Sequence, residues 1–310
     1  MKMRMLGVTL AAAAVALAGC SSDDSAGGSA SGGTESITIA TTNFSETTLL
    51  ANMYQQVLAA NGVEASIKEL TTREVIVPAL ESGEIQATPE YLGSFTEFVN
   101  KQVNGPDAPQ LATGDADATY AAAKPLAAEK NITLLTPSPA QDQNAFAVTA
   151  EFATANNLKS LSDLAAWSQT NAVNLGGPPE CPERPFCQPG LEQTYGIKVA
   201  SFTPLDAGGP LTVQALTQGK VNVGLVFSSS GSITSNNLVV LTDDKQLQTA
   251  ENVTPAVNTS AASETVVKAL DSVSAVLTTD ELQAMNQQIE VDRKNPKTVA
   301  EEFLKSKGLL

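Results

Sequence analysis

Residues 73–94 read REVIVPALESGEIQATPEYLGS, and this stretch predicts the kind of fold that the chain adopts. Residues 73–81 have the pattern of a helix, and Ser82-Gly83 closes it because glycine readily takes the left-handed conformation at a helix end. Residues 85–88 then read as a short strand, which leads into the polar turn Pro89-Glu90-Tyr91-Leu92-Gly93-Ser94. The stretch is therefore one helix–strand unit of an α/β fold that ends in a polar turn.

The residues before this stretch extend the same pattern. Residues 36–41 alternate and are rich in β-branched side chains, so they predict a strand, and residues 65–70 predict a second one. Between them, residues 46–58 place apolar side chains on one helical face, with Ser45 as the expected N-cap and Gly62 as the end signal. The order β-α-β-α-β predicts a mostly parallel sheet covered by helices on both faces.

The pattern recurs later in the chain. Strands are predicted at residues 144–149, 172–175 and 221–227, and helices at 162–167 and 211–218. The order of helix, glycine, strand and polar turn, seen first at Gly83 and again at Gly219, predicts two similar α/β lobes. Ligands bind at the carboxyl ends of parallel strands in such sheets, so a cleft between the lobes is the expected site. An envelope scaffold, the alternative for this chain, would not need two sets of cleft turns.

The first lobe is expected to contain two separate parts of the chain and the second lobe one continuous part. We predict a first lobe of residues 37–142 plus 242–310, a second lobe of residues 143–241, and a hinge between them. Helices predicted at residues 264–276, 279–286 and 296–305 would return to complete the first lobe.

The N-terminus predicts export and a lipid anchor. Lys2 and Arg4 precede an apolar stretch at residues 5–17, and the run Leu17-Ala18-Gly19-Cys20 follows, which is the pattern of a secretory signal. This run resembles the lipobox of bacterial lipoproteins, so residues 1–19 are the predicted signal peptide and Cys20 the predicted lipidation site. The alternative, a transmembrane anchor, would require an apolar stretch of about 20 residues. The expected location is extracytoplasmic, anchored by lipid to the outer face of the cell membrane.

Residues 20–36 are predicted to be a flexible tether behind that lipid. The segment consists mainly of Ser, Gly, Asp and Ala and has no large apolar side chain, so it cannot bury enough surface to offset the entropy of ordering. Glycine and serine give such a segment the behaviour of a flexible coil. The folded part is therefore expected to begin near Ile37.

Composition excludes several classes of function. The net charge is −15, and loss of Lys2 and Arg4 with the signal makes it −17, which disfavours nucleic acid or anionic lipid headgroups as partners. The chain has no histidine, the commonest general acid or base and metal ligand. We therefore expect no enzyme activity, no cofactor and no metal site.

Two cysteines remain once Cys20 is assigned to the lipid. Cys181 and Cys187 lie in a segment, residues 176–190, whose prolines and glycines predict a rigid loop rather than a helix. An oxidising compartment favours a disulfide between them. The alternative is a metal site, but two thiols without a histidine or a second cysteine pair lack the four ligands that zinc prefers.

Several motifs together resemble one family. They are similar to motifs of the glycine betaine/choline/carnitine (osmoprotectant) binding proteins of ABC importers. The motifs are Thr42-Asn43-Phe44-Ser45-Glu46, Pro89-Glu90-Tyr91-Leu92-Gly93-Ser94, residues 144–148, Gly176-Gly177-Pro178-Pro179-Glu180, Arg184-Pro185, Pro189-Gly190-Leu191, Tyr195-Gly196 and Asp243-Asp244-Lys245. The resemblance implies the two-lobed, hinge-bending periplasmic-binding-protein fold of type II. It also implies a monomer that closes on a small solute and delivers it to a permease powered by a separate ATPase.

The resemblance also implies a set of ligand-binding residues. Family members hold a quaternary ammonium group in a cage of tyrosines, because a desolvated cation is attracted to aromatic faces. The implied set is Asn43, Phe44, Thr47, Tyr91, Ser94, Asn144, Arg184, Phe227 and Ser228. Tyr91 keeps one tyrosine of the cage and Phe227 stands where another usually is, whereas Asn144 occupies the position of a third.

This departure leaves two expectations for the ligand. The first is an osmoprotectant-like solute, and the second is a different polar or aromatic ligand for import or sensing, because the cage is incomplete. Arg184 has two alternatives as well, since its guanidinium group can grip a ligand carboxylate or pair with Glu180 or Glu183. Tyr91 and Phe227 could instead be core aromatics.

Overall fold

The computed structural model describes residues 36–42 and 44–310. The predicted signal peptide, Cys20, Asn43 and all of the predicted tether except Ser36 lie outside these residues. Among the residues that the structure describes, none of the helices is both long and apolar enough to cross a membrane.

The first sheet has five strands in the order β2-β1-β3-β10-β4. They are β1 (Ser36–Thr41), β2 (Glu64–Glu69), β3 (Ala87–Tyr91), β4 (Ile132–Leu134) and β10 (Val253–Asn258). Strand β1 runs parallel to β2 and β3, whereas β10 is antiparallel to both of its neighbours. The predicted strand at 85–88 lies further along the chain, because the residues up to Tyr91 pair with β10.

The second sheet repeats this arrangement with the order β7-β6-β8-β5-β9. Its strands are β5 (Asn144–Thr149), β6 (Val173–Gly177), β7 (Val199–Pro204), β8 (Val223–Phe227) and β9 (Leu238–Val240). Strand β6 is parallel to β7 and β8, and β5 is antiparallel to β8 and β9. The antiparallel strand in each sheet, β10 or β5, is the one that the chain forms directly after leaving the other sheet.

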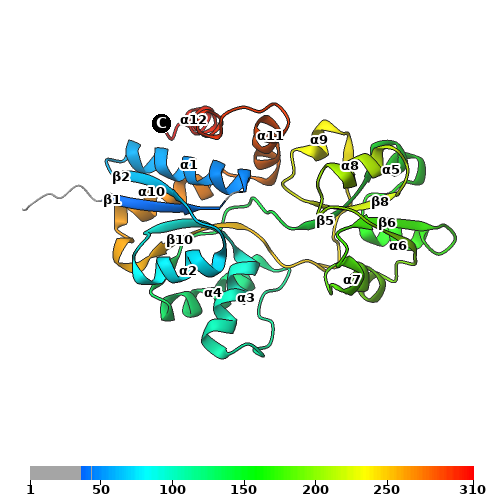
Figure 1. Ribbon diagram of the computed structural model, residues 1–310, viewed down its shortest axis with the longest axis horizontal. Coiled ribbons are helices and arrows are strands. Elements are labelled where there is room, and N and C mark those ends of the chain that lie inside the picture. The colour runs from blue at the N-terminus through cyan, green and yellow to red at the C-terminus, as the bar shows by residue number, and fades with distance from the viewer. Residues whose placement is uncertain (1–35, 43) are drawn as a thin grey trace, which may run out of the picture. The chain divides into compact units, whose positions relative to one another are not determined.

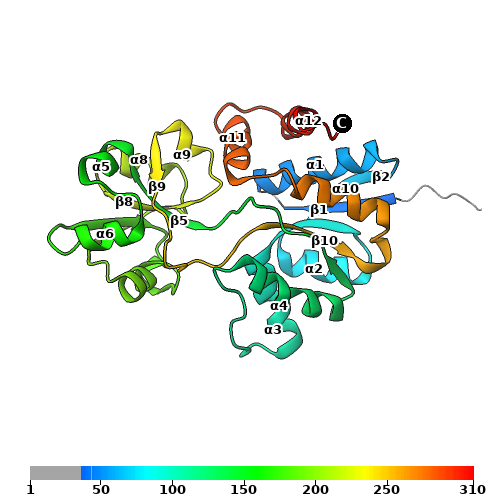
Figure 2. The ribbon, with the colours of Figure 1, turned by 180° about the vertical axis from the view of Figure 1, so that it is seen from behind.

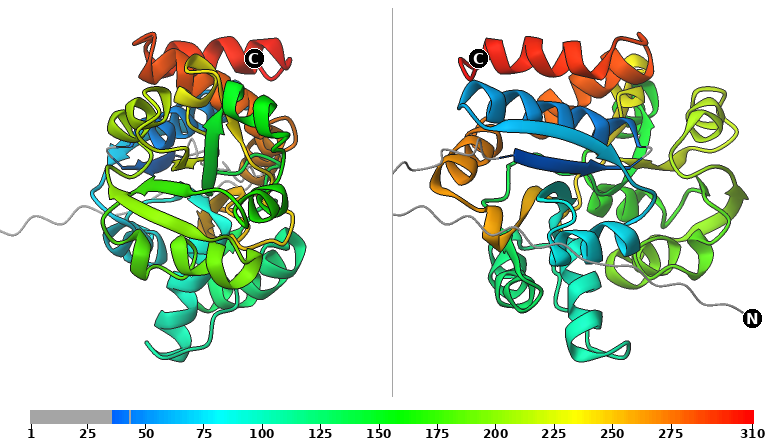
Figure 3. Two further views of the ribbon diagram at one scale, coloured as in Figure 1. Left: turned by 90° about the vertical axis from the view of Figure 1, so that its right-hand side faces the viewer. Right: turned by 60° about the vertical axis from the view of Figure 1, so that its left-hand side comes forward.

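Helices cover both faces of the first sheet (Figure 1). One face carries α1 (Ser45–Ala60), α10 (Glu264–Ser274), α11 (Thr279–Glu290) and α12 (Pro296–Ser306), and the other carries α2 (Arg73–Ser82), α3 (Leu92–Asn104) and α4 (Ala116–Glu129). The C-terminal helix α12 packs along α1, as the views in Figure 3 also show. The C-terminal helices therefore pack on the first sheet.

The second sheet is also flanked on both faces (Figure 2). Its helical elements are α5 (Ala150–Asn156), α6 (Leu161–Trp167), η1 (Cys181–Glu183), α7 (Gln188–Gly190), η2 (Leu191–Tyr195), α8 (Pro210–Thr217) and α9 (Ser232–Ser235). Helices α8 and α9 contribute to one core, and α5, α6 and η2 to the other. Two sheets flanked by helices confirm the predicted α/β fold class, with one antiparallel interior strand in each mostly parallel sheet.

Two local expectations are wrong. The N-cap of α1 is Phe44, and Ser45 is the first helical residue, whose hydroxyl donates a hydrogen bond to Glu290 Oε1 at 3.1 Å. The segment at 176–190 contains the turns η1 and α7, because proline is tolerated in the first turn of a helix, where its missing N–H is not needed.

Two chain segments, residues 135–143 and 241–252, run between the sheets. They pair with each other through an antiparallel bridge at Gln141 and Asn252, and the Asp142 N–H donates to the Glu251 carbonyl at 3.0 Å. We call these two segments the crossing segments. Because the described backbone passes from one sheet to the other in these two segments, they are the natural place for a hinge.

Candidate ligand-binding cleft

A cavity of about 830 Å³ lies between residues of the two sheets, and we call it the main cavity. It is lined by five of the predicted site residues, namely Tyr91, Ser94, Asn144, Arg184 and Phe227. Tyr91 ends β3, Phe227 ends β8, and Asn144 lies opposite Phe227 in the β5–β8 pairing. The carboxyl ends of parallel strands in both sheets therefore contribute side chains to one space, as the strand order predicts.

Two further cavities adjoin the main cavity through shared side chains. A cavity of about 870 Å³ is lined by Phe44, Phe227 and residues 208–210, and a smaller one of about 210 Å³ by Phe44, Thr47 and Tyr91. Phe227 borders both of the larger cavities, and Tyr91 borders the main cavity and the small one. Phe44, Tyr91 and Phe227 therefore each line two neighbouring cavities of one cleft.

Tyr91 is held by a buried glutamate. Its hydroxyl donates a hydrogen bond to Glu46 Oε1 at 2.5 Å, and Asn286 Nδ2 donates to the other carboxylate oxygen, also at 2.5 Å. Glu46 is 0% exposed, and this burial raises the pKa of its carboxyl. The pKa of the Tyr91 hydroxyl is also raised, first by burial and then by the charge of Glu46. This network fixes the direction in which the tyrosine ring enters the cleft.

Sequence reasoning missed Glu46 as a site residue, although a signal was present. Glu46 is spaced by three, four and seven residues from Leu49, Leu50 and Met53, which are fully buried, as is the helix face they form. A carboxylate on the buried face of a helix requires hydrogen-bond partners. Its position therefore indicates a polar network beneath the cleft.

Asp142, which sequence reasoning also missed, lines the main cavity from a crossing segment. It accepts a hydrogen bond from the Ser229 hydroxyl at 2.7 Å. Burial, followed by the nearby charge of Glu46, raises the pKa of the Asp142 carboxyl to about 7. Within residues 36–42 and 44–310, no lysine or arginine forms an ion pair with Asp142.

An ion pair between the partly exposed Arg73 and the buried Glu90 borders Tyr91. Arg73 donates from Nε to Glu90 Oε2 at 3.0 Å and from Nη2 to the same oxygen at 2.8 Å. Burial lowers the pKa of the Arg73 guanidinium, but the charge and hydrogen bonds of Glu90 outweigh it and raise the pKa above its ordinary value. The guanidinium of Arg73 is therefore already committed to a carboxylate of the chain itself.

Ser94 is likewise tied to an acidic side chain. Its backbone N–H and its hydroxyl donate to the two carboxylate oxygens of Glu251, at 3.0 and 2.8 Å. Burial raises the pKa of the Glu251 carboxyl, while the hydrogen bonds from Ser94 work in the opposite direction. The Ser94 hydroxyl thus holds a crossing segment against the start of α3.

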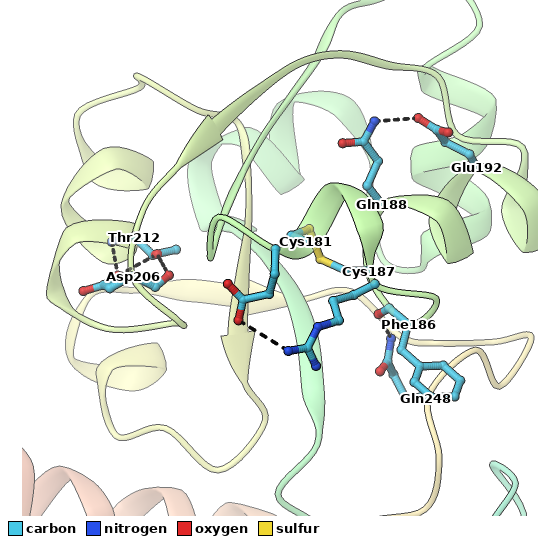
Figure 4. Close-up of a disulfide and its surroundings, with 10 residues drawn as sticks. Cys181, Phe186, Cys187, Gln188, Glu192, Asp206, Thr212 and Gln248 are labelled. Atoms are coloured by element: carbon cyan, nitrogen blue, oxygen red, sulfur yellow. Dashed lines mark hydrogen bonds and ion pairs between the residues drawn. A yellow bond between two sulfur atoms is a disulfide. The ribbon is translucent and has the colours of Figure 1, made fainter. Parts of the chain in front are cut away.

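Of the two helices that begin beside the cleft, α8 has its first N–H groups bonded to a side chain, whereas α1 has no side-chain cap. At α8, the Asp206 carboxylate accepts hydrogen bonds from the N–H groups of Leu211 and Thr212, both at 2.9 Å, and Figure 4 shows Asp206 beside Thr212. At α1, the Thr47 hydroxyl accepts from the Thr42 N–H at 3.3 Å and donates to the Phe44 carbonyl at 2.9 Å. Thr47 is thus buried in the turn that presents Phe44 to the cleft.

Arg184 reaches the main cavity from the loop of the two cysteines. Its side chain is 67% exposed and lies 3.9 Å from Glu180, a distance at which an exposed pair contributes little. The sulfur atoms of Cys181 and Cys187 lie at bonding distance, and Gln248 Nε2 donates to the Phe186 carbonyl at 2.8 Å (Figure 4). The loop is thereby fastened to a crossing segment.

Ser228 is placed differently from the other predicted site residues. Its hydroxyl donates to the Gln141 carbonyl at 3.0 Å and accepts from the Gln143 N–H at 2.9 Å. It does not line any of the three cavities described above. Its neighbour Ser229, which the predicted set omits, lines one of them and contacts Asp142.

Comparisons with known proteins agree with this geometry. Residues 35–306 match the family described as the substrate-binding domain of the ABC-type glycine betaine transport system. The chain is 32% identical over 273 residues to the glycine betaine-binding protein YehZ of Escherichia coli K12, covering 85% of this chain and 88% of that protein. The structure of apo YehZ from E. coli has a TM-score of 0.76 at 29% identity and covers 88% of this chain and 99% of that one.

Two other similarities are more limited. A crystal structure of a glycine betaine/carnitine/choline ABC transporter has a TM-score of 0.79 at 23% identity, covers 88% of this chain and 99% of that one, and supports the fold alone. The ergothioneine transport permease/ergothioneine-binding protein EgtU of Helicobacter pylori G27 is 27% identical over 165 residues, which cover 53% of this chain and 29% of that protein.

Proposed function

This chain belongs to the family of substrate-binding domains of ABC-type glycine betaine transport systems, and on that premise we propose that it captures an osmoprotectant-like solute of the glycine betaine, choline or carnitine type in its cleft. Its relatives are substrate-binding proteins of transport systems, so the chain is a binding protein and not an enzyme.

The observation that carries the proposal is the composition of the main cavity. Tyr91 from the first sheet and Phe227 from the second line the same space, together with the polar side chains of Ser94 and Asn144. Aromatic faces attract a desolvated cation, and polar side chains can orient the rest of a small solute. Of the proposed ligand-binding set, Phe44 completes the aromatic surface from the adjoining cavities, and Arg184 supplies a cation at the rim.

We propose that capture proceeds by closure of two lobes about the crossing segments. The first lobe comprises residues 37–142 and 242–310, and the second comprises residues 143–241. Ser228 acts in this scheme as a hinge contact, because its hydroxyl bonds to both Gln141 and Gln143. Closure would bring Tyr91 and Phe227 onto opposite sides of the solute.

A second candidate is a different polar ligand on the same fold, for import or sensing. Asn144 favours it, since an amide stands where the family resemblance implies a tyrosine and lines the main cavity. Each absent cation–π contact forfeits on the order of 0.5–2 kcal/mol of binding energy for a quaternary ammonium. A hydrogen-bonding ligand would recover part of that energy from the amide.

The cellular setting is part of the proposal. Solute-binding proteins of this family serve importers, and we propose a permease with its ATPase as the partner, and lipidation at Cys20 after removal of residues 1–19 as the membrane anchor. The oxidising environment outside the cytoplasm would allow the Cys181–Cys187 disulfide to form. The chain would act as a monomer, since one copy contains both sides of the cleft.

Calorimetric titration of the chain beginning at Ser21 tests the proposal. The panel contains glycine betaine, choline, carnitine and a broad set of metabolites. Saturable binding of one methylammonium solute with a stoichiometry of one supports the first candidate, and binding confined to another polar metabolite supports the second. The absence of binding to every solute would contradict both.

A further inference from the structure

We infer that the cleft holds the cationic group of its solute through the Asp142 carboxylate, and that it therefore prefers ammonium groups bearing an N–H to fully methylated ones. This inference rests on the proposed function, because it assigns the substrate class of the same cleft. It concerns a residue that the family resemblance does not place in the ligand-binding set.

Asp142 occupies the position in the main cavity where such a contact is possible. It lines the same space as Tyr91 and Phe227, and its charge influences the Tyr91 hydroxyl directly. The hydrogen bonds to its carboxyl come from Ser229, through the hydroxyl at 2.7 Å and the backbone N–H. A carboxylate has about four acceptor sites, so room remains for a donor from the solute.

Glu251 and Glu97, two other carboxylates that line this cavity, also accept hydrogen bonds from the chain. Glu251 accepts from the Ser94 N–H and hydroxyl and from the Thr249 hydroxyl. Glu97 Oε1 accepts from two backbone N–H groups, those of Leu111 and Ala112, both at 2.7 Å. Asp142 accepts two such hydrogen bonds, fewer than Glu251 and as many as Glu97, and both come from a single residue, Ser229.

The positive groups near the cleft are too committed or too exposed to neutralise Asp142. Arg73 is held by Glu90, Arg184 extends largely into solvent, and Lys101, which also lines the main cavity, is exposed. The helix N-termini do not compensate for it either, since Asp206 caps α8 and Glu46 lies in the first turn of α1. A cation that enters the cleft therefore meets an anion without a counter-ion.

The chemistry of the two kinds of ammonium group decides the preference. A trimethylammonium group has no N–H and depends on aromatic faces. The aromatic residues that line this cavity are Tyr91, Phe98, Phe186 and Phe227, of which one is a tyrosine. A dimethylammonium group keeps one N–H, which can donate a charge-assisted hydrogen bond to a carboxylate. Where the aromatic cage is incomplete, the N–H contact gives the less methylated ion the advantage.

The surroundings of Asp142 make this contact dependent on pH. Glu46 on α1 and Glu290 on α11 face Asp142 with like charge, and burial together with Glu46 raises its pKa to about 7. The Tyr91 hydroxyl stays protonated in this range, because its own pKa is raised. Only ionised Asp142 attracts a cation strongly, so affinity should rise about tenfold between pH 6 and pH 8 as the ionised fraction rises.

Matched ligand pairs test the inference on the unmodified chain beginning at Ser21. Dimethylglycine is compared with glycine betaine, and dimethylethanolamine with choline, by calorimetric titration at pH 6, 7 and 8. We expect the dimethylammonium member of at least one pair to bind about tenfold more tightly than its trimethylammonium partner, and more tightly at pH 8 than at pH 6.

Substitution of Asp142 provides the second arm. Asp142→Asn should abolish the preference within the pair and flatten the pH dependence, while circular dichroism confirms that the variant is folded. Asp107→Asn is the matched control, because it makes the same change at an exposed residue that lines none of the three cavities. It should leave both the preference and the pH dependence unchanged.

The outcomes separate this inference from the proposed function. Equal or tighter binding of the trimethylammonium members, unaltered by Asp142→Asn, would overturn the role of Asp142 and leave solute capture standing. No binding of either pair or of any solute in the wider panel would overturn the proposed function and this inference together.

Discussion

The segments at the carboxyl ends of β3 and β8, which we call the first and the second turn, have similar sequence settings and different roles. Each follows a helix, a glycine and a strand, and each places an aromatic residue, Tyr91 or Phe227, at the edge of the main cavity. The first turn is bound to buried charge, because Glu46 holds the Tyr91 hydroxyl. The second turn continues into Ser228 and Ser229, whose hydroxyls bond to a crossing segment.

This difference indicates that the first turn is the more rigid of the two and that the second is the more mobile. The first turn is braced by ion pairs and buried carboxylates, which cost free energy to disturb. The second turn is fastened mainly by neutral hydroxyls to the segment that would flex during closure, and such hydrogen bonds contribute about 1 kcal/mol each. We infer that the first turn is a fixed wall of the cleft and that the second moves with the hinge.

The largest expected effect comes from breaking the charged support of the first turn. Arg73→Ala leaves Glu90, which is almost wholly buried, without its partner, and should lower the free energy of unfolding by about 3–5 kcal/mol. Urea denaturation followed by circular dichroism measures this change. The control is Lys68→Ala, which breaks the exposed pair with Glu84 and should cost about 1 kcal/mol or less. Equal losses in the two variants would remove the claim that the first turn is a braced wall.

A smaller effect should distinguish the hydrogen bonds of the two turns. Glu46→Ala leaves the Tyr91 hydroxyl and the Asn286 amide without their acceptor and should cost about 2–4 kcal/mol. Ser229→Ala removes one hydroxyl contact to Asp142 and should cost about 1 kcal/mol. Thermal unfolding of both variants measures the difference. A larger loss for Ser229→Ala would reverse the order that the structure indicates.

The smallest effect is a dependence of stability on pH. Asp142 has a raised pKa of about 7, so the folded chain keeps a proton on it that the unfolded chain has lost above pH 4. The contribution of this group to the stability of the folded state is therefore complete below pH 4 and is lost as the pH rises through 7. The free energy of unfolding should fall by about 1–3 kcal/mol between pH 5 and pH 7.5. Denaturation at several pH values checks this slope.

The same measurement has an internal check. Burial also raises the pKa values of Glu46 and Glu251, so both add to the slope in the same direction. Asp142→Asn should reduce the slope without removing it. A free energy of unfolding that rises between pH 5 and 7.5 would show that these carboxyls are stabilised in their ionised form instead.

Much of the fold follows from local sequence patterns. The stretch at 73–94 predicted the helix and its glycine end correctly, and its recurrence near Gly219 predicted the second sheet. These features depend on periodicity and turn chemistry, which are local. The predicted polar turn at 89–94 was wrong, because these residues are the end of β3 and the start of α3. The shift of β3 toward Tyr91 was not predictable in this way, since it depends on pairing with β10 far along the chain.

The candidate site was predictable in its aromatic part and not in its charged part. Tyr91 and Phe227 stand at strand ends, where ligands bind in such folds. The role of Asp142 depends on where a crossing segment lies against Glu46 and Ser229, and no short-range pattern encodes that position. Ser228 shows the converse, because a residue beside the cleft in sequence contacts the hinge in space.

The central claim is that a solute is captured between Tyr91 and Phe227, and calorimetric titration of the double variant Tyr91→Ala/Phe227→Ala tests it most directly. The solute is whichever methylammonium compound binds the unmodified chain most tightly. We predict saturable binding to the unmodified chain and a loss of affinity of at least tenfold in a double variant that remains folded. Affinity that is unchanged in the folded double variant would place the binding site elsewhere and contradict the account.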